Sequence, residues 1–124
     1  MNNQNLENEK PSAEEAFLAS ALRRSELLRQ NDVKAANREY DLVHKAFKRL
    51  RERPDRGEAA LKRIALVEDF DVQNLAAAAL LAIDEDFAIS LLEKVQRNSS
   101  GLPGLAAEMT IREWKRGTLR DYWG

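Results

Sequence analysis

The stretch Val72–Ile83, VQNLAAAALLAI, decides the fold. Alanine and leucine stand on almost every side of its helical wheel, and a helix that is apolar all round lies in the middle of a packed stack. Its longest uninterrupted apolar run is nine residues, Leu75–Ile83, well short of the roughly 20 that a helix needs to cross a bilayer. The stretch therefore predicts a buried central helix with other helices around it.

Two amphipathic helices are predicted at the start of the chain. Ser12 followed by Glu15 has the capping-box spacing, so the first helix should begin there and run to about Gln30. Its inner face is expected to carry Phe17, Leu18, Ala21, Leu22 and Leu28. The second begins at Asp32, ends before Pro54, and has a seam at Val33, Ala36, Tyr40, Val43, Phe47 and Leu50. The connection is so short that the two helices should form an antiparallel hairpin.

Three further helices complete a predicted all-α fold of about six helices. Asp55, with Glu58 three residues on, should cap a helix whose apolar side is Ala59, Leu61, Ile64, Ala65 and Leu66. Another helix is expected over 87–98, with Ala88, Leu91, Leu92 and Val95 as its buried stripe. By composition 99–104 is a loop. The last helix should run from Leu105 to Arg116, stop at Gly117, and pack Met109 and Trp114 on the helix before it.

Length and composition favour one domain without a strong electrostatic preference. The chain has 124 residues, 20 Lys and Arg against 21 Asp and Glu, and no cysteine. A net charge of -1 gives no basic field for nucleic acid or an anionic membrane, so neither is expected as a partner. We predict a disordered tail over 1–11, a single helical domain over 12–119, a C-terminal tail over 120–124, and a cytoplasmic location.

The residues that carry chemistry are few. His44 is the sole histidine, which excludes a site built from several histidines, and its place at the edge of a helical seam favours a structural role. We therefore expect a protein that is not an enzyme and holds neither a cofactor nor a metal.

Two acidic turns are the clearest polar features. The first contains Asp69 and Asp71, and the second contains Asp84, Glu85 and Asp86. Asp71 and one of Asp84 or Asp86 should cap helices, while both turns are candidate rims for a basic partner. About 12 helical residues separate the two turns, or roughly 18 Å at the standard helical rise, so they are predicted to be separate surfaces.

Two other segments have a structural and a functional interpretation. The basic stretch over 45–56 is interpreted as a solvated helix end whose charges favour the C-terminal dipole. A nucleic-acid site is the alternative, but the stretch has neither a recognised docking motif nor a run of stacking aromatic residues. Tyr122 and Trp123 follow the helix-terminating glycine, and either fold back onto the end of the stack or form a contact surface.

Several stretches resemble a family of small bacterial HEAT-like proteins that is catalogued as a domain of unknown function. Over 71–80 the order of aspartate, valine and an Ala/Leu helix resembles the HEAT pattern, although Gln73 stands where many such units have a basic residue. The similarity spans about 13–119, and its other motifs are 31–41, with Asn37, Arg38, Tyr40 and Asp41, then Ile83-Asp84, and 104–110 followed by Trp114 and Gly117.

This resemblance implies antiparallel helical hairpins stacked as a short, right-handed, HEAT-like superhelix. Proteins of this kind are often encoded beside secreted polymorphic toxins, so it also implies a bacterial immunity protein that binds and neutralises a cognate toxin. Asn37 and Arg38 join the five acidic residues as candidate partner-binding positions. A general intracellular adaptor or a self-assembling scaffold is the alternative.

Overall fold

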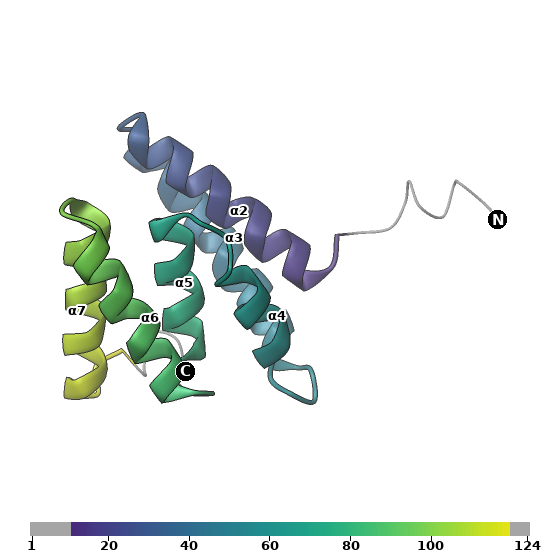
Figure 1. Ribbon diagram of the computed structural model, residues 1–124. Coiled ribbons are helices and arrows are strands. Elements are labelled where there is room, and N and C mark those ends of the chain that lie inside the picture. Colours follow the sequence, from purple (N-terminus) through teal and green to yellow (C-terminus); the bar gives the residue numbers. More distant parts are fainter. Residues whose placement is uncertain (1–10, 120–124) are drawn as a thin grey trace.

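Six α-helices build residues 11–119, the part of the chain that the computed structural model describes (Figure 1). They are α2 (Ala13–Arg29), α3 (Val33–Arg51), α4 (Glu58–Ile64), α5 (Phe70–Leu80), α6 (Glu85–Asn98) and α7 (Leu102–Arg116). No strand occurs within these residues, so the all-α prediction is confirmed. The helices pack as successive hairpins, while the right hand expected of their superhelix stays a prediction.

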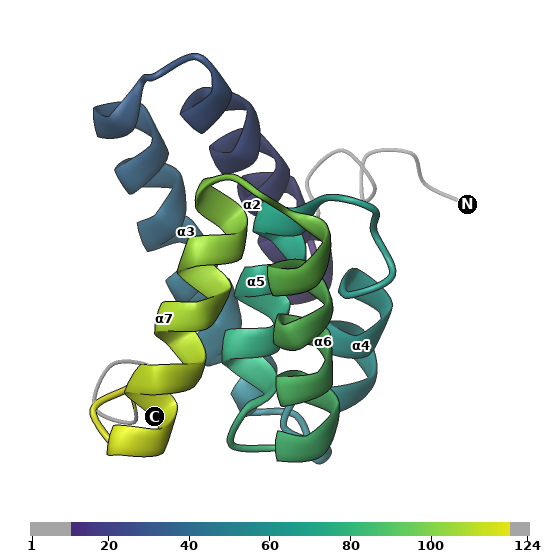
Figure 2. The same ribbon diagram turned by 60° about the vertical axis from the view of Figure 1, so that its left-hand side comes forward.

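The first hairpin, α2–α3, forms as predicted. The Ser12 hydroxyl accepts a hydrogen bond from the Glu15 amide at 3.1 Å, and the Glu15 carboxylate accepts one from the Ser12 amide, also at 3.1 Å. Two predicted core positions are wrong. Val33 is 58% exposed, because it stands at the tip of the hairpin, which extends past α5 (Figure 2). Leu22 is 40% exposed, because it is rotated by about 100° from the buried Ala21.

Helix α4 begins later than predicted. Its N-cap is Gly57, with a left-handed φ of 85°. A β-carbon at this glycine would lie 2.7 Å from the Leu50 Cβ, so the turn out of α3 requires glycine both for its dihedral and for its closeness. The Asp55 carboxylate still accepts hydrogen bonds from the Gly57 and Ala59 amides, at 2.8 and 3.0 Å. Leu61, Ile64 and Ala65 of the predicted apolar side are buried, but Ala59 is exposed, and Leu66 is exposed in the turn beyond the end of the helix.

Helix α5 is the centre of the stack, as predicted, and packs against α2, α4, α6 and α7. Its cap was assigned to the wrong aspartate. Asp69, not Asp71, is the N-cap, and its Oδ1 accepts from the Val72 amide at 3.0 Å. The helix also ends at Leu80, before the predicted Ile83. The amides of Ile83 and Asp84 donate to the Leu80 carbonyl in a turn, and Asp84 then caps α6.

Helices α6 and α7 form the last hairpin. The predicted stripe of α6 is buried, and Gly117 ends α7 with a φ of 81°, as expected. The loop predicted over 99–104 is confirmed only over 99–101, because α7 already begins at Leu102 with Pro103 in its first turn, where a missing amide hydrogen costs nothing. Trp114 is buried, but Met109 is 50% exposed and does not pack inward as predicted.

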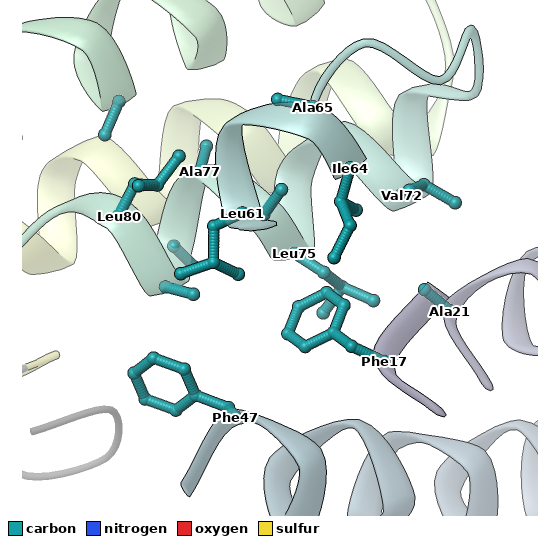
Figure 3. Close-up of a cluster of buried hydrophobic side chains, with 14 of the residues drawn as sticks. Phe17, Ala21, Phe47, Leu61, Ile64, Ala65, Val72, Leu75, Ala77 and Leu80 are labelled. Atoms are coloured by element: carbon teal, nitrogen blue, oxygen red, sulfur yellow. The ribbon is translucent and has the colours of Figure 1, made fainter. Parts of the chain in front are cut away.

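One cluster of buried apolar side chains connects all six helices. In Figure 3 the fully buried Phe17 of α2 lies beside Ile64 of α4 and Leu75 of α5, with Phe47 of α3 across from it. The core therefore holds the first hairpin against the centre of the stack. Within residues 11–119, no helix combines the length and the apolar character that a membrane crossing requires.

Candidate protein-binding groove

One face of α5 is the floor of a groove, which we call the α5 groove. Asp71, Asn74, Leu75 and Ala78 line this floor at helical spacings of three, one and three residues, so they share one side of the helix. The walls are Arg24 of α2 and Tyr40 of α3 on one side, and Ala106, Thr110 and the following Leu119 on the other. The groove has a volume of about 220 Å³.

Asn74 of the groove floor has one buried, unpaired acceptor. Its Nδ2 donates a hydrogen bond to the Pro103 carbonyl at 2.9 Å and so ties α5 to the first turn of α7. Its Oδ1 is buried and has no hydrogen-bond partner within the described residues. A buried carbonyl oxygen without a partner costs about 1–3 kcal/mol, so this oxygen is a local weakness in the packing of α5.

The opposite wall combines a cation and an aromatic ring. The Arg24 guanidinium lies 5.3 Å from the centroid of the Tyr40 ring, within cation–π range. The ring of His44 is also close, with its centroid 5.2 Å from that of Tyr40. This stacking holds the guanidinium donors of Arg24 at the mouth of the groove.

A polar cluster at the N-terminal end of α5 includes the groove-lining Asp71. The Ser25 hydroxyl lies 2.8 Å from Asp69 Oδ2 and 3.2 Å from Asp71 Oδ2, and it accepts a hydrogen bond from Arg29 at 2.9 Å. One hydroxyl has one proton, so it donates to one carboxylate at a time. Burial raises the pKa of the Asp71 carboxyl, the charge of Asp69 raises it further, and the Ser25 hydrogen bond opposes both.

Beside the groove, α7 carries an exposed apolar stripe, the α7 stripe. Leu102, Leu105 and Met109 are 79%, 52% and 50% exposed. Their spacing places them on one side of the helix, opposite the buried face that includes Ala107 and Trp114. The groove-lining Ala106 and Thr110 lie between these two faces, so the stripe continues the wall of the groove outward.

The structure places the predicted acidic residues at two ends of α5. Asp69 and Asp71 come together around Ser25, as described. Asp84 caps α6 through the Phe87 amide at 3.2 Å and pairs with Lys62 at 2.8 Å, and the Lys62 hydrogen bond lowers the pKa of the Asp84 carboxyl.

The remaining predicted residues lie on other surfaces. Glu85 and Asp86 are exposed in the first turn of α6, and Asn37 and Arg38 are exposed on α3. None of these four lines the α5 groove. Of the seven predicted positions, Asp71 alone is both in the polar cluster and in the groove.

Sequence reasoning missed most of the groove. Arg24, Asn74 and Thr110 come from three helices and carry no shared motif, so only the packing of those helices brings them together. Ser25 did leave a signal: it follows Phe17 and Ala21 at steps of four and is fully buried with them. A hydroxyl in a buried helical stripe needs a polar partner, and here the partners are the two aspartates.

The titratable groups near the α5 groove are few. The described residues contain no group of three or more His, Cys, Asp or Glu side chains placed to hold a metal ion. His44 is half-buried, and burial lowers the pKa of its imidazole. The α5 groove itself is lined by Leu75 and Ala78 on its floor, by the Asp71 carboxylate and by the Arg24 guanidinium.

Comparisons with protein-family models, with curated proteins and with solved structures found no match for this chain. The resemblance to small HEAT-like proteins therefore stays a prediction, and the function has to be argued from the surface.

Proposed function

We propose that this chain is a non-catalytic protein-binding domain whose partner covers the α7 stripe and inserts a side chain into the α5 groove. The observation that carries this proposal is the stripe, where Leu102, Leu105 and Met109 are each at least half exposed. Contiguous exposed apolar surface bordered by polar groups is typical of protein interaction sites. The adjoining groove supplies the hydrogen-bonding groups that orient a partner.

The layout matches the anatomy of a protein interface. The centre of such an interface is apolar and its rim is polar, and a few buried side chains carry most of the binding free energy. Here the three apolar residues of the stripe form the centre, while Arg24, Asp71 and Asn74 are polar positions within the groove. A stable complex buries roughly 1,200–2,000 Å² in total, so the partner must extend beyond the stripe over neighbouring helices.

The partner we propose is a cognate toxin, which makes the chain a bacterial immunity protein. The resemblance described above supports this choice. The exposed carboxylates of Glu85 and Asp86 would speed the encounter with a basic toxin surface. The test is to co-purify the chain with the toxin encoded beside its gene and to measure toxin activity at a saturating concentration of the chain. Unchanged toxin activity contradicts this function.

The surface assignment has its own test. Leu105→Glu places a charge at the centre of the stripe and is expected to weaken partner binding by about 30-fold or more, the effect of losing about 2 kcal/mol at an interface hot spot. Leu66→Glu is the matched control, because Leu66 is 77% exposed in the turn before α5 and lies outside the groove. Equal binding by both variants in calorimetry would show that the stripe is not the interface.

A self-assembling scaffold is the second candidate. It is favoured by the position of the stripe on the last helix of the described stack, where a second copy would extend the stack. Sedimentation velocity separates the two functions. Assembly of the pure chain that Leu105→Glu abolishes supports the scaffold, whereas a monomer that binds the toxin supports the immunity protein.

A further inference from the structure

The exposed side of α7 continues beyond the α7 stripe. Leu102, Leu105 and Met109 are followed by Arg112 and Arg116, which are exposed as well. The steps between these five residues are three, four, three and four. Such a repeat keeps side chains on one side of a helix, here over about 21 Å at the standard rise. We call these five residues the α7 seam.

The α7 seam has the spacing of a surface on which another helix packs. Alternating steps of three and four residues place side chains where two helices interlock along their length. The buried stripe of α6 uses the same steps at Ala88, Leu91 and Val95. Helix α7 packs its opposite face against α5 and α6 and lies at one edge of the stack (Figure 1). The seam is therefore arranged to receive one further helix.

The charges of the α7 seam specify the chemistry of that helix. The seam is apolar from Leu102 to Met109 and basic at Arg112 and Arg116. Arg112 pairs with Glu108 on α7 at 3.1 Å, and within residues 11–119 no carboxylate lies within ion-pair distance of Arg116. A complementary helix therefore carries apolar side chains along one part and carboxylates along the other.

Helix dipoles favour one direction for the incoming helix. Carboxylates stabilise a helix in its first turns and cations stabilise it in its last turn, and Arg116 lies in the last turn of α7. A helix antiparallel to α7 places its own first turns over Arg112 and Arg116. Its carboxylates then interact favourably both with the two guanidinium groups and with their own helix dipole. A parallel helix would place the same carboxylates in its last turns, where the dipole opposes them.

An antiparallel helix that matches the seam has a defined sequence pattern. Read from Arg116 back to Leu102, the steps are four, three, four and three. The matching helix thus has acids at positions i and i+4 and apolar residues at i+7, i+11 and i+14. Within residues 11–119 no two Asp or Glu residues lie four apart, so none of the described helices of a second copy carries this pattern. The matching helix therefore belongs to another protein.

We propose that the protein partner binds the α7 seam with an amphipathic α-helix that runs antiparallel to α7. Acidic residues in the first turns of that helix face Arg112 and Arg116, and the apolar residues that follow cover Met109, Leu105 and Leu102. The inference rests on the proposed function, because it names the part of the partner that covers the α7 stripe.

The test titrates the isotope-labelled full-length chain with a synthetic helical peptide in NMR. The peptide consists of alanine and glutamine, with glutamate at i and i+4 and leucine at i+7, i+11 and i+14. It is expected to shift the amide signals of Leu105, Met109 and Arg112 to saturation, while the signals of α2 and α3 keep their positions. A peptide with the reversed sequence has the same composition and should bind about threefold to tenfold more weakly, the effect of losing two exposed ion pairs.

Two neighbouring residues of α7 supply a matched pair of variants. Arg116 belongs to the seam, whereas Lys115 is equally exposed in the same turn but lies about 100° around the helix. Arg116→Glu should weaken binding of the peptide about threefold or more, and Lys115→Glu should leave it unchanged, while circular dichroism shows equal helix content in both variants. Absence of saturable shifts at the seam, or equal weakening by the two variants, overturns the proposal.

The outcomes separate this inference from the proposed function. A toxin that the chain neutralises, but that binds Arg116→Glu as tightly as the parent chain, overturns the antiparallel helix and leaves the immunity function standing. Peptide binding at the seam together with an unaffected toxin supports the helix and contradicts the immunity function. Self-association of the pure chain in sedimentation velocity that Leu105→Glu abolishes also overturns the inference, because the occupant is then a second copy.

Discussion

Replacing Gly104 by alanine is predicted to destabilise the protein, although alanine is the better helix former. Gly104 is buried in the first turns of α7 and faces the C-terminal end of α6. An alanine β-carbon would lie 2.2 Å from the Ser99 carbonyl oxygen and 3.2 Å from its carbon. Both are backbone atoms, so neither can rotate away as a side-chain tip would, and α6 and α7 must move apart.

Two opposing contributions set the magnitude. Alanine in place of glycine inside a helix gains about 1 kcal/mol. Overpacking a close contact costs about 1–3 kcal/mol, and the rigid backbone at Ser99 places this site in the upper half of that range. The difference is a net loss of about 1–2 kcal/mol in the free energy of unfolding. The same movement of α7 should strain the hydrogen bond from Asn74 to Pro103 and widen the α5 groove.

Urea unfolding followed by far-UV circular dichroism measures this loss. Ala106→Gly is the matched control, because Ala106 is exposed two residues further along α7 and its replacement reports helix propensity alone, a loss of about 1 kcal/mol. If Gly104→Ala instead stabilises the chain by as much as Ala106→Gly destabilises it, the site has room for a methyl group and the close-packing argument is refuted.

Two further predictions concern the polar cluster and the core. Burial raises the pKa of the Asp71 carboxyl above its usual 3.8, so Asp71 binds its proton more tightly in the folded chain than in the unfolded chain. The stability that this proton contributes is present below pH 3.8 and is lost as the pH rises through the raised pKa of the folded state. The Asp71→Asn variant should therefore gain stability relative to the parent chain as pH rises from below 3.8 towards neutral. Urea unfolding of both chains across this pH range measures the difference, and a variant that loses stability relative to the parent as pH rises contradicts the prediction. Phe17→Ala removes a fully buried ring and should lower the free energy of unfolding by about 3–5 kcal/mol. Leu22→Ala on the same helix is the control and should cost less than about 1 kcal/mol. Comparable losses for the two variants in thermal unfolding would refute the assignment of Phe17 to the core.

The parts of the fold that sequence predicted correctly depend on contacts within a few residues. The capping box of Ser12 and Glu15 and the apolar stripe of α6 are examples, because hydrogen bonds and helical periodicity act over one or two turns. Where short-range signals were ambiguous, the boundary was wrong. Asp69 and Asp71 are both suitable caps, and the choice of Asp69 accompanies the placing of Asp71 beside Ser25 from another helix.

The start of α7 shows the same limit in another way. Gly101, Pro103 and Gly104 have the composition of a loop, yet two of them lie inside the helix. Glycine at 104 serves the close approach of α6 and α7, a tertiary requirement that has no local signature.

The sequence by itself determined that this chain forms helices, where the first two begin, and that the stretch around Val72–Ile83 supplies the central one, because these properties follow from local hydrogen bonding and the spacing of apolar residues. Only the tertiary structure decided what the helices present to a partner. Arg24, Tyr40, Asn74 and Thr110 meet because four helices pack around one floor. Leu105 and Met109 stay exposed because α7 turns its opposite face to α5 and α6. Packing between distant segments sets these surfaces, and no periodicity within a single helix encodes it.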